Sequence, residues 1–198
     1  MEITGNAALL VVDVQKGFLE TERWGARNEP DADARIAALI DGWRASGRPV
    51  VFVRHDSAEP GSPLRPGCPG NDFQDYVEER RGQGGGGLLV TKTVNSAFYG
   101  TPDLDGWLRA AGIGQLAVVG VQTNMCVETT ARMGGNLGYD VLFVLDATYT
   151  FDLVGPFGWR LGADALARAT AVSLHGGGFA RVVRTEEVLG ALGVGGGG

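Results

Sequence analysis

Three residues whose side chains could together carry out nucleophilic catalysis each follow an apolar run of the sequence. Asp13 follows the run AALLVV, Lys92 follows LLVT, and Cys126 follows LAVVG and the connecting residues VQTNM. A thiolate attacks a carbonyl carbon, a nearby ammonium or helix N-terminus stabilises it, and a carboxylate accepts the thiol proton. Taken singly, a loop acid, a surface lysine and a small buried thiol are ordinary structural residues. Their joint placement after apolar runs nevertheless favours a cysteine hydrolase.

The apolar runs have the length and composition of buried strands. Because they are almost continuously apolar, helices are expected to cover both faces of a mainly parallel sheet in an α/β fold. Ligands bind beyond the carboxyl ends of the strands in such sheets, so Asp13, Lys92 and Cys126 are expected at one edge. The six expected strands are Ala7–Val12, Pro49–Val53, Leu88–Val90, Leu116–Val119, Val141–Leu145 and Arg181–Val183. The four expected helices lie around Asp31–Ser46, Asp103–Ala111, Asn124–Leu137 and Trp159–Leu174.

Length and charge narrow the class of protein. The 198 residues are enough for one domain with its own core, expected over residues 1–192, with a Gly-rich, disordered tail at 193–198. The formal net charge of −6, from 17 basic and 23 acidic residues, argues against nucleic acid or an anionic membrane as the main partner. A small-molecule substrate is the better expectation.

The N-terminal sequence MEITGNAALLVVDVQ is unlike a signal peptide, because an acidic residue stands where a basic start is expected and the apolar run is short. No stretch approaches the roughly 20 apolar residues that span a bilayer. The two cysteines, Cys68 and Cys126, lie in very different sequence contexts. We therefore expect a reduced, cytoplasmic protein.

The chain resembles isochorismatase-like cysteine hydrolases. Their successive motifs are similar, in order and spacing, to LLVVDVQKGF, VTKTVNSAFYGT, GVQTNMCVETTARMG and GYDVLFVLDAT. The resemblance runs from about Ala7 to about Val183, which is nearly the whole chain. It implies a three-layer α-β-α fold whose six-stranded, mainly parallel sheet has the strand order 3-2-1-4-5-6.

The resemblance also implies a role for each residue of the triad. Cys126 is implied as the nucleophile, Asp13 as the general acid/base, and Lys92 as the electrostatic partner that holds them in place. Lys92 and the helix N-terminus are expected to lower the pKa of the Cys126 thiol. A non-proline cis peptide bond is implied between Val121 and Gln122, and the backbone N–H groups of Gln122 and Cys126 are implied as an oxyanion hole.

Four residues are candidates for substrate contacts. Gln15, Phe18 and Phe98 lie inside the family-like motifs, and His55 follows the second expected strand. A packing role remains the alternative for each phenylalanine, and a hydrogen-bonded loop histidine is the alternative for His55. A cysteine–histidine dyad would require His55 or His175, and a structural role is favoured for His175, which ends the last expected helix.

No metal or other cofactor is expected. Nicotinamidases of this superfamily have an Asp-x-His pair near the end of the second strand and a further downstream histidine as metal ligands. Here the corresponding residues are Arg54, His55 and Asp56, and the next histidine is His175. The required ligand cluster is missing from the sequence, which also argues against nicotinamide as the substrate.

The implied activity is hydrolysis of a small amide-like C–N bond, in an amide, a carbamoyl or ureido compound, or a lactam. The route would pass through a thioester on Cys126, with Asp13 alternating between acid and base. Two alternatives stay open: hydrolysis of an isochorismate-like vinyl ether, and small-molecule binding without catalysis. A nucleotide-dependent oxidoreductase is not favoured, because no GxGxxG follows the first strand.

The segment FDLVGPFGW, residues 151–159, is too apolar to lie comfortably in water. Because similar proteins are commonly dimers or tetramers, we expect this segment to meet a neighbouring subunit near the mouth of the active site. The protein is therefore expected to be a homo-oligomer.

Overall fold

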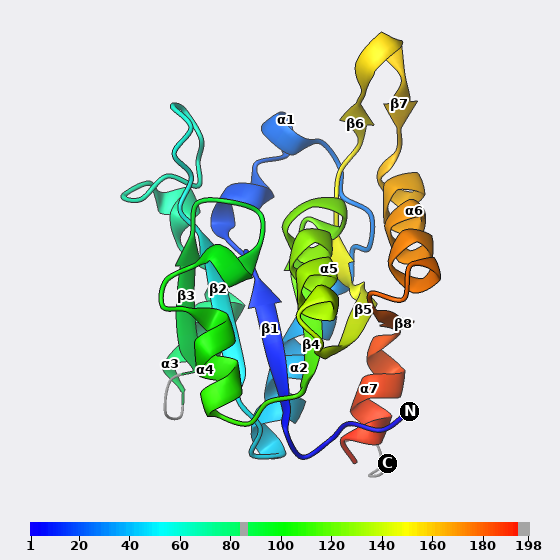
Figure 1. Ribbon diagram of the computed structural model, residues 1–198. Coiled ribbons are helices and arrows are strands. Elements are labelled where there is room, and N and C mark those ends of the chain that lie inside the picture. The colour runs from blue at the N-terminus through cyan, green and yellow to red at the C-terminus, as the bar shows by residue number, and fades with distance from the viewer. Residues whose placement is uncertain (84–86, 194–198) are drawn as a thin grey trace.

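The computed structural model describes residues 1–83 and 87–193, and a six-stranded sheet lies at its centre (Figure 1). The strands are β1 (Ala7–Val12), β2 (Val50–His55), β3 (Leu88–Lys92), β4 (Gln115–Val121), β5 (Asp140–Tyr149) and β8 (Arg181–Val183). Every pair of neighbouring strands is parallel, and the order is β3-β2-β1-β4-β5-β8. This confirms the expected fold and order, since β8 is the sixth expected strand and two short strands outside the sheet precede it.

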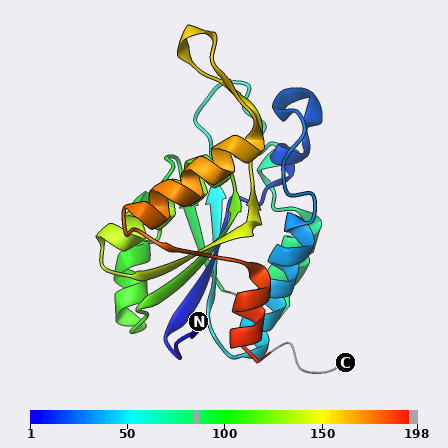
Figure 2. The same ribbon diagram turned by 90° about the vertical axis from the view of Figure 1, so that its right-hand side faces the viewer.

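Helices cover both faces of the sheet, which makes three layers (Figures 1 and 2). Alternate residues of β1 pack into two different hydrophobic cores. Leu9 and Val11 face one layer of helices, and Leu10 and Val12 face the other. Both sheet faces are therefore buried, as the continuous apolar runs predict. The first layer is formed by α2 (Ala32–Ala45), α3 (Asp75–Gly82) and α7 (Thr185–Ala191). The second is formed by α4 (Leu104–Ala110), α5 (Glu128–Asn136) and α6 (Ala163–Gly176).

The connection between β5 and α6 is a hairpin, which the sequence patterns do not predict. Its antiparallel strands are β6 (Leu153–Val154) and β7 (Arg160–Leu161), and it projects beyond the sheet (Figures 1 and 2). The sequence pattern predicts a helix from Trp159, but α6 begins at Ala163, whose backbone N–H donates to Asp152 Oδ1. The prediction was wrong there, because the apolar residues before Ala163 belong to the returning strand of the hairpin.

Short helical turns connect the main elements. The one-turn helix α1 (Thr21–Trp24) follows a 3-10 turn at Lys16–Leu19. A π-helical turn at Thr123–Val127 leads from β4 into α5. Further 3-10 turns lie at Pro69–Asn71, Ala97–Tyr99 and Pro156–Gly158.

The elements from β1 to α7 all belong to one sheet, its two covering layers and their connections. The described part of the chain ends at residue 193, so residues 194–198 of the expected Gly-rich tail lie outside it. Within the described part, no helix combines the length and the apolar character needed to span a bilayer.

Glycine at position 120 lets β1 and β4 approach each other near the carboxyl edge of the sheet. Gly120 has a φ of +123°, and a Cβ atom there would lie 2.0 Å from the carbonyl oxygen of Val12. Asp13 follows Val12 directly, so this close approach also helps to set where the Asp13 carboxylate lies.

We expect Gly120→Ala to lower the free energy of unfolding by more than the about 1–3 kcal/mol that a disfavoured backbone conformation costs, because the added methyl group also meets backbone atoms. Gly112→Ala is a matched control, since φ there is +68° and no heavy atom of the described residues lies within 4 Å of the added Cβ. Urea unfolding followed by circular dichroism measures both losses. Equal losses for the two variants would contradict the role of Gly120.

Candidate active site

A buried ion pair joins the ends of β1 and β3. The residue after β1, Asp13, has a φ of +53° and donates its backbone N–H to the carbonyl of Val53. Lys92 is the last residue of β3, and its Nζ lies 2.5 Å from Asp13 Oδ2. Both side chains are buried. Asp13 Oδ1 has no hydrogen-bond partner among the described residues, so it is free to accept a proton.

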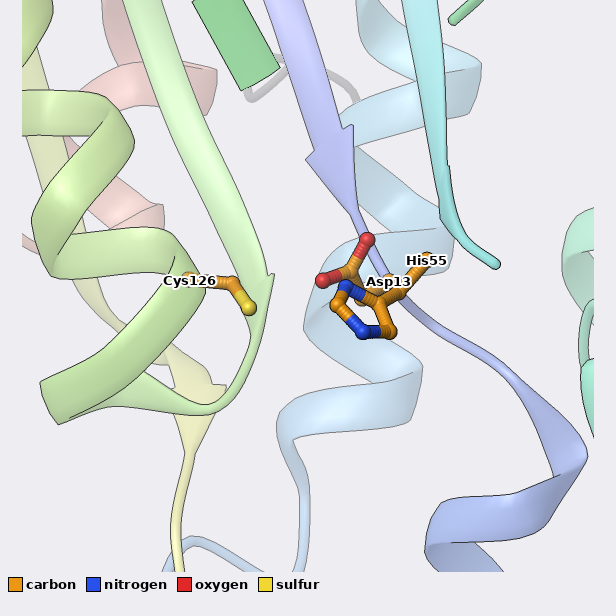
Figure 3. Close-up of side chains that lie close together, drawn as sticks. All are labelled: Asp13, His55 and Cys126. Carbon is orange, nitrogen blue, oxygen red and sulfur yellow. The ribbon is translucent and has the colours of Figure 1, made fainter. Parts of the chain in front are cut away.

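The thiol of Cys126 lies beside this pair. Cys126 is in the π-helical turn between β4 and α5 and is 9% exposed. One ligand atom from each of Asp13, His55 and Cys126 lies within 4.8 Å of the others, and Figure 3 shows the sulfur directed toward the other two side chains. The structure thus brings Asp13, Lys92 and Cys126 into one cluster, although they are far apart along the chain.

Cys126 is a thiol rather than a thiolate in the resting protein. Burial raises the pKa of the Cys126 thiol well above its usual value, the negative charge of Asp13 raises it further, and Lys92 acts in the opposite direction. The prediction that this pKa is lowered was wrong, because it left out burial and Asp13. A thiolate forms only when a base removes the proton, and Asp13 is the adjacent base.

Lys92 stays an ammonium and fixes the protonation of His55. Burial lowers the pKa of Lys92, but the Asp13 carboxylate beside it acts in the opposite direction, and the net pKa is raised. Burial and then Lys92 lower the pKa of His55, so its imidazole is neutral at pH 7. Lys92 Nζ lies 3.1 Å from His55 Nδ1 and donates to it. The hydrogen of the neutral ring is therefore on Nε2.

Gln15 holds the backbone of His55. Its Nε2 donates to the carbonyls of His55 and Asn71, and its Oε1 accepts the backbone N–H of His55. The side chain is buried by these contacts and is not part of the cavity lining. The prediction of Gln15 as a substrate contact is therefore corrected, because backbone groups already use its amide.

A cavity of about 330 Å³ opens onto Asp13, His55 and Cys126. Phe18 lines it and packs against Trp24, with 5.2 Å between the ring centroids. Phe98 does not line it and packs against Tyr139 under α4 and α5, so its prediction as a substrate contact is corrected. The 3-10 turn that contains Phe98 directs its ring into the core.

Several lining residues were not singled out from the sequence. Most of them lie in connecting segments, whose course the hydrophobic pattern does not determine. Asn95 and Met125 could have been found, since they lie in the family-like segments VTKTVNSAFYGT and GVQTNMCVETTARMG. Asn95 Oδ1 is 4.0 Å from Cys126 Sγ. The additional lining residues are Arg23, Ser57, Ala58, Glu59, Ser62, Leu64, Thr93, Asn95 and Met125.

The loop before Cys126 offers a backbone donor. The peptide bond between Val121 and Gln122 is cis, and Gln122 lines the cavity together with Cys126. No backbone carbonyl of the described residues accepts the N–H of Gln122. That N–H is therefore able to donate to a bound carbonyl oxygen.

The same cluster contains three atoms of the kinds that ligate metals, from Asp13, His55 and Cys126. Lys92 competes with a metal cation for two of these side chains, because its ammonium contacts Asp13 Oδ2 and His55 Nδ1. The residues therefore fit a metal ion poorly, and a protein without a catalytic metal stays our prediction.

We expect dialysis against EDTA to change neither the catalytic rate nor the melting temperature, because Lys92 already supplies the positive charge beside Asp13. Elemental mass spectrometry of the dialysed protein measures the bound metal. A divalent ion that stays at stoichiometric level, or activity that returns only when Zn²⁺ is added back, would contradict this expectation.

The chain is similar to known proteins in both sequence and structure. A family model described as the isochorismatase domain matches residues 7–182. Streptothricin hydrolase of Streptomyces noursei is 38% identical over 149 residues, which cover 74% of this chain and 55% of that protein. Nicotinamidase 3 of Arabidopsis thaliana is 32% identical over 195 residues, which cover 94% and 88%. The crystal structure of an isochorismatase-family protein from Chromobacterium violaceum has a TM-score of 0.89 and 39% identity, covering 98% of this chain and 97% of that one.

Proposed function

Because this chain belongs to the isochorismatase family of hydrolases, we propose that it cleaves a small amide-like C–N bond through a thioester on Cys126. The observation that carries the proposal is the cluster of Cys126 Sγ, the free Oδ1 of Asp13 and the ammonium of Lys92 at one cavity. The substrate is an amide, a carbamoyl or ureido compound, or a lactam. A nicotinamidase and a streptothricin hydrolase among the relatives support this range of compounds.

In the first half-reaction, Asp13 Oδ1 removes the proton from Cys126 Sγ and the sulfur attacks the carbonyl carbon. The developing oxyanion accepts hydrogen bonds from the backbone N–H groups of Gln122 and Cys126. The C–N bond then breaks, and the departing nitrogen takes the proton from Asp13. The products are an amine or ammonia and an acyl thioester on Cys126, whereas a lactam gives a single ring-opened thioester that keeps the amine.

In the second half-reaction, a water molecule gives a proton to Asp13 as its oxygen attacks the thioester carbon. The C–S bond breaks, the acid product leaves, and the proton on Asp13 returns to the sulfur. Lys92 stays charged throughout and keeps Asp13 Oδ2 in place, so that only Oδ1 exchanges protons. His55 takes no proton in either step, because Lys92 already donates to its Nδ1.

A panel of small amides, ureides, lactams and an isochorismate-like vinyl ether tests this function. We expect at least one C–N compound to be hydrolysed, with the acid product detected by mass spectrometry and ammonia, where released, by a coupled assay. Turnover of the vinyl ether alone would favour the alternative that the protein hydrolyses an isochorismate-like vinyl ether. Saturable binding of the compounds without turnover of any would favour a non-catalytic binding protein.

We also propose that the β6–β7 hairpin packs against a second copy of the chain. Phe157 is 89% exposed and Trp159 is 65% exposed, and Val154 and Leu161 on the hairpin strands are also exposed. An isolated two-stranded hairpin is marginally stable in water, and an exposed apolar patch of this kind is typical of an interface. The carboxyl edge of the sheet lies at the same end of the molecule as the hairpin (Figure 1).

We expect a dimer or tetramer at micromolar concentration, measured by size-exclusion chromatography with light scattering. A variant with Phe157→Ser and Trp159→Ser should dissociate, because it removes the two largest exposed rings of the hairpin. Tyr99→Ser is the matched control, since Tyr99 is an aromatic residue on another element and its exposure of 70% lies between those of Trp159 and Phe157. A wild-type monomer would contradict the proposal.

The expected partner and the expected cellular location are part of the same proposal. A small molecule, and not nucleic acid or a membrane, is the proposed partner, in keeping with the net charge of −6. Cys68 and Cys126 are both free thiols, as the proposed cytoplasmic setting requires.

A further inference from the structure

The loop that follows β2 presents hydrogen-bond donors to the cavity. Ser57 and Ser62 both line the cavity and are each 7% exposed. The Oγ of Ser57 accepts the backbone N–H of Glu59, and the Oγ of Ser62 accepts the backbone N–H of Leu64. These contacts use a lone pair of each oxygen and leave its hydrogen to be donated.

His55, the last residue of β2, adds a third donor directly before this loop. Its Nδ1 accepts from the Lys92 ammonium at 3.1 Å, which places the ring hydrogen on Nε2. His55 also lines the cavity. Its Nε2–H is the one ring group left to bind a ligand, and this group is a hydrogen-bond donor. The end of β2 and the loop after it thus contribute three donors to one wall of the cavity.

Arg23 continues this wall toward solvent. Its Cζ lies 5.4 Å from the centroid of the Trp24 ring, and its Nη1 donates to the carbonyl of Gly61 at 3.4 Å. None of the ion pairs among the described residues includes Arg23. The guanidinium is therefore held at the cavity while most of its N–H groups stay available for a planar, two-oxygen acceptor.

Two carboxylates line the cavity: Asp13, whose charge is paired with Lys92 at the inner end, and Glu59, which is the one acidic group on this wall. The Glu59 side chain is exposed at the rim, whereas the two serine hydroxyl groups are buried in the wall. A cationic ligand would meet a single exposed carboxylate and four donors that it cannot use. An anionic ligand group with several hydrogen-bond acceptors matches the four donors, which outnumber the single carboxylate and include the two buried serine hydroxyl groups.

We propose that Arg23, His55, Ser57 and Ser62 select a substrate that carries a carboxylate in addition to the amide bond that is cleaved. This inference rests on the proposed function, because the cavity is taken as the substrate site. Arg23 and the two serines bind the carboxylate, and His55 donates to the carboxylate oxygen that lies nearer the reacting carbonyl. The reacting carbonyl lies next to Cys126 at the inner end of the cavity.

The test is a set of calorimetric titrations of the Cys126→Ala protein, in which no acyl group can be transferred. The probes are malonamate, succinamate and glutaramate, and their three diamides, which differ from them only in the carboxylate. We expect at least one amide-acid to bind more than tenfold more tightly than its diamide. Arg23→Gln should remove most of that difference, and Ser57→Ala with Ser62→Ala should weaken the binding several-fold.

Glu59→Gln is the matched control on the same rim, and it should leave the affinity for the amide-acid unchanged or increase it. Equal affinities for every acid and its diamide, no binding of any amide-acid, or no effect of Arg23→Gln would overturn the inference. A loss of affinity in Glu59→Gln as large as in Arg23→Gln would also overturn it. The titration involves no turnover, so its outcome is independent of whether a thioester forms on Cys126.

Discussion

Replacement of Cys126 with alanine is expected to lower kcat/KM for the amide substrate by more than about 10⁴-fold, because the acyl group cannot be transferred without the sulfur atom. Initial rates with the best compound of the amide panel measure this loss. Cys68→Ala is the matched control, since Cys68 is the other free thiol and is not part of the cavity lining. It should retain wild-type activity.

The alanine variant should still bind the substrate, because Phe18, Ser57 and Asn95 line the cavity independently of the thiol. Equilibrium binding by calorimetry separates this loss of chemistry from a loss of affinity. A Cys126→Ala protein that keeps a tenth or more of the wild-type rate would exclude the thioester route.

Replacement of Asp13 with asparagine is expected to lower kcat by about 10²–10⁴-fold, the usual contribution of a general acid/base. Asparagine keeps an oxygen that can accept from Lys92 but cannot take the proton of Cys126. The rate is measured with the same amide substrate, and the melting temperature shows whether the fold persists.

A second measurement on Asp13→Asn distinguishes a lost base from a damaged site. Burial and then the charge of Asp13 raise the pKa of Cys126, whereas Lys92 lowers it. Removing the Asp13 charge leaves Lys92 in place, so the pKa of the thiol should fall toward its ordinary value. Iodoacetamide, which reacts with the thiolate, should therefore alkylate Cys126 faster at pH 7 in this variant, although hydrolysis is slower. Alkylation that slows together with hydrolysis would contradict the assigned role of Asp13.

The cluster of Asp13, Lys92 and Cys126 could be predicted because of a simple property of parallel sheets. Each residue follows a continuously apolar run, and parallel strands bring their carboxyl ends to one edge. The structure places each residue at or just beyond such an end, with Lys92 as the last residue of β3. Strand polarity was therefore enough to predict that the three residues lie at one edge of the sheet, and the family resemblance implied that they form one triad.

The substrate contacts were harder to predict, because side-chain direction depends on local turns. Gln15 and Phe98 both lie inside family-like motifs, yet the amide of Gln15 binds the backbone around His55 and Phe98 packs against Tyr139. Sequence spacing does not determine which face of a 3-10 turn points into a cavity. The loop that contributes Ser57 and Ser62 has no hydrophobic period that could have indicated its course.

The direction of the Cys126 pKa shift could not be read from neighbouring residue types. The presence of Lys92 and a helical turn indicates a lowered pKa, but burial of the thiol and the charge of Asp13 outweigh both. Burial is a property of the packed protein, so it becomes visible only in the structure. The same holds for the β6–β7 hairpin, because its second strand, β7, lies inside the stretch from Trp159 that the sequence pattern predicts as helical.

The central claim is that the sulfur of Cys126 forms a covalent bond to the substrate acyl group. Rapid acid quench during turnover, followed by peptide mass spectrometry, tests it most directly. The account predicts an adduct whose mass equals the substrate minus the departing amine or ammonia (or the whole ring-opened substrate for a lactam), confined to the peptide that contains Cys126 and absent from Cys126→Ala. Product formation during the same time course with no adduct on Cys126, and with undiminished rate in Cys126→Ala, would contradict it.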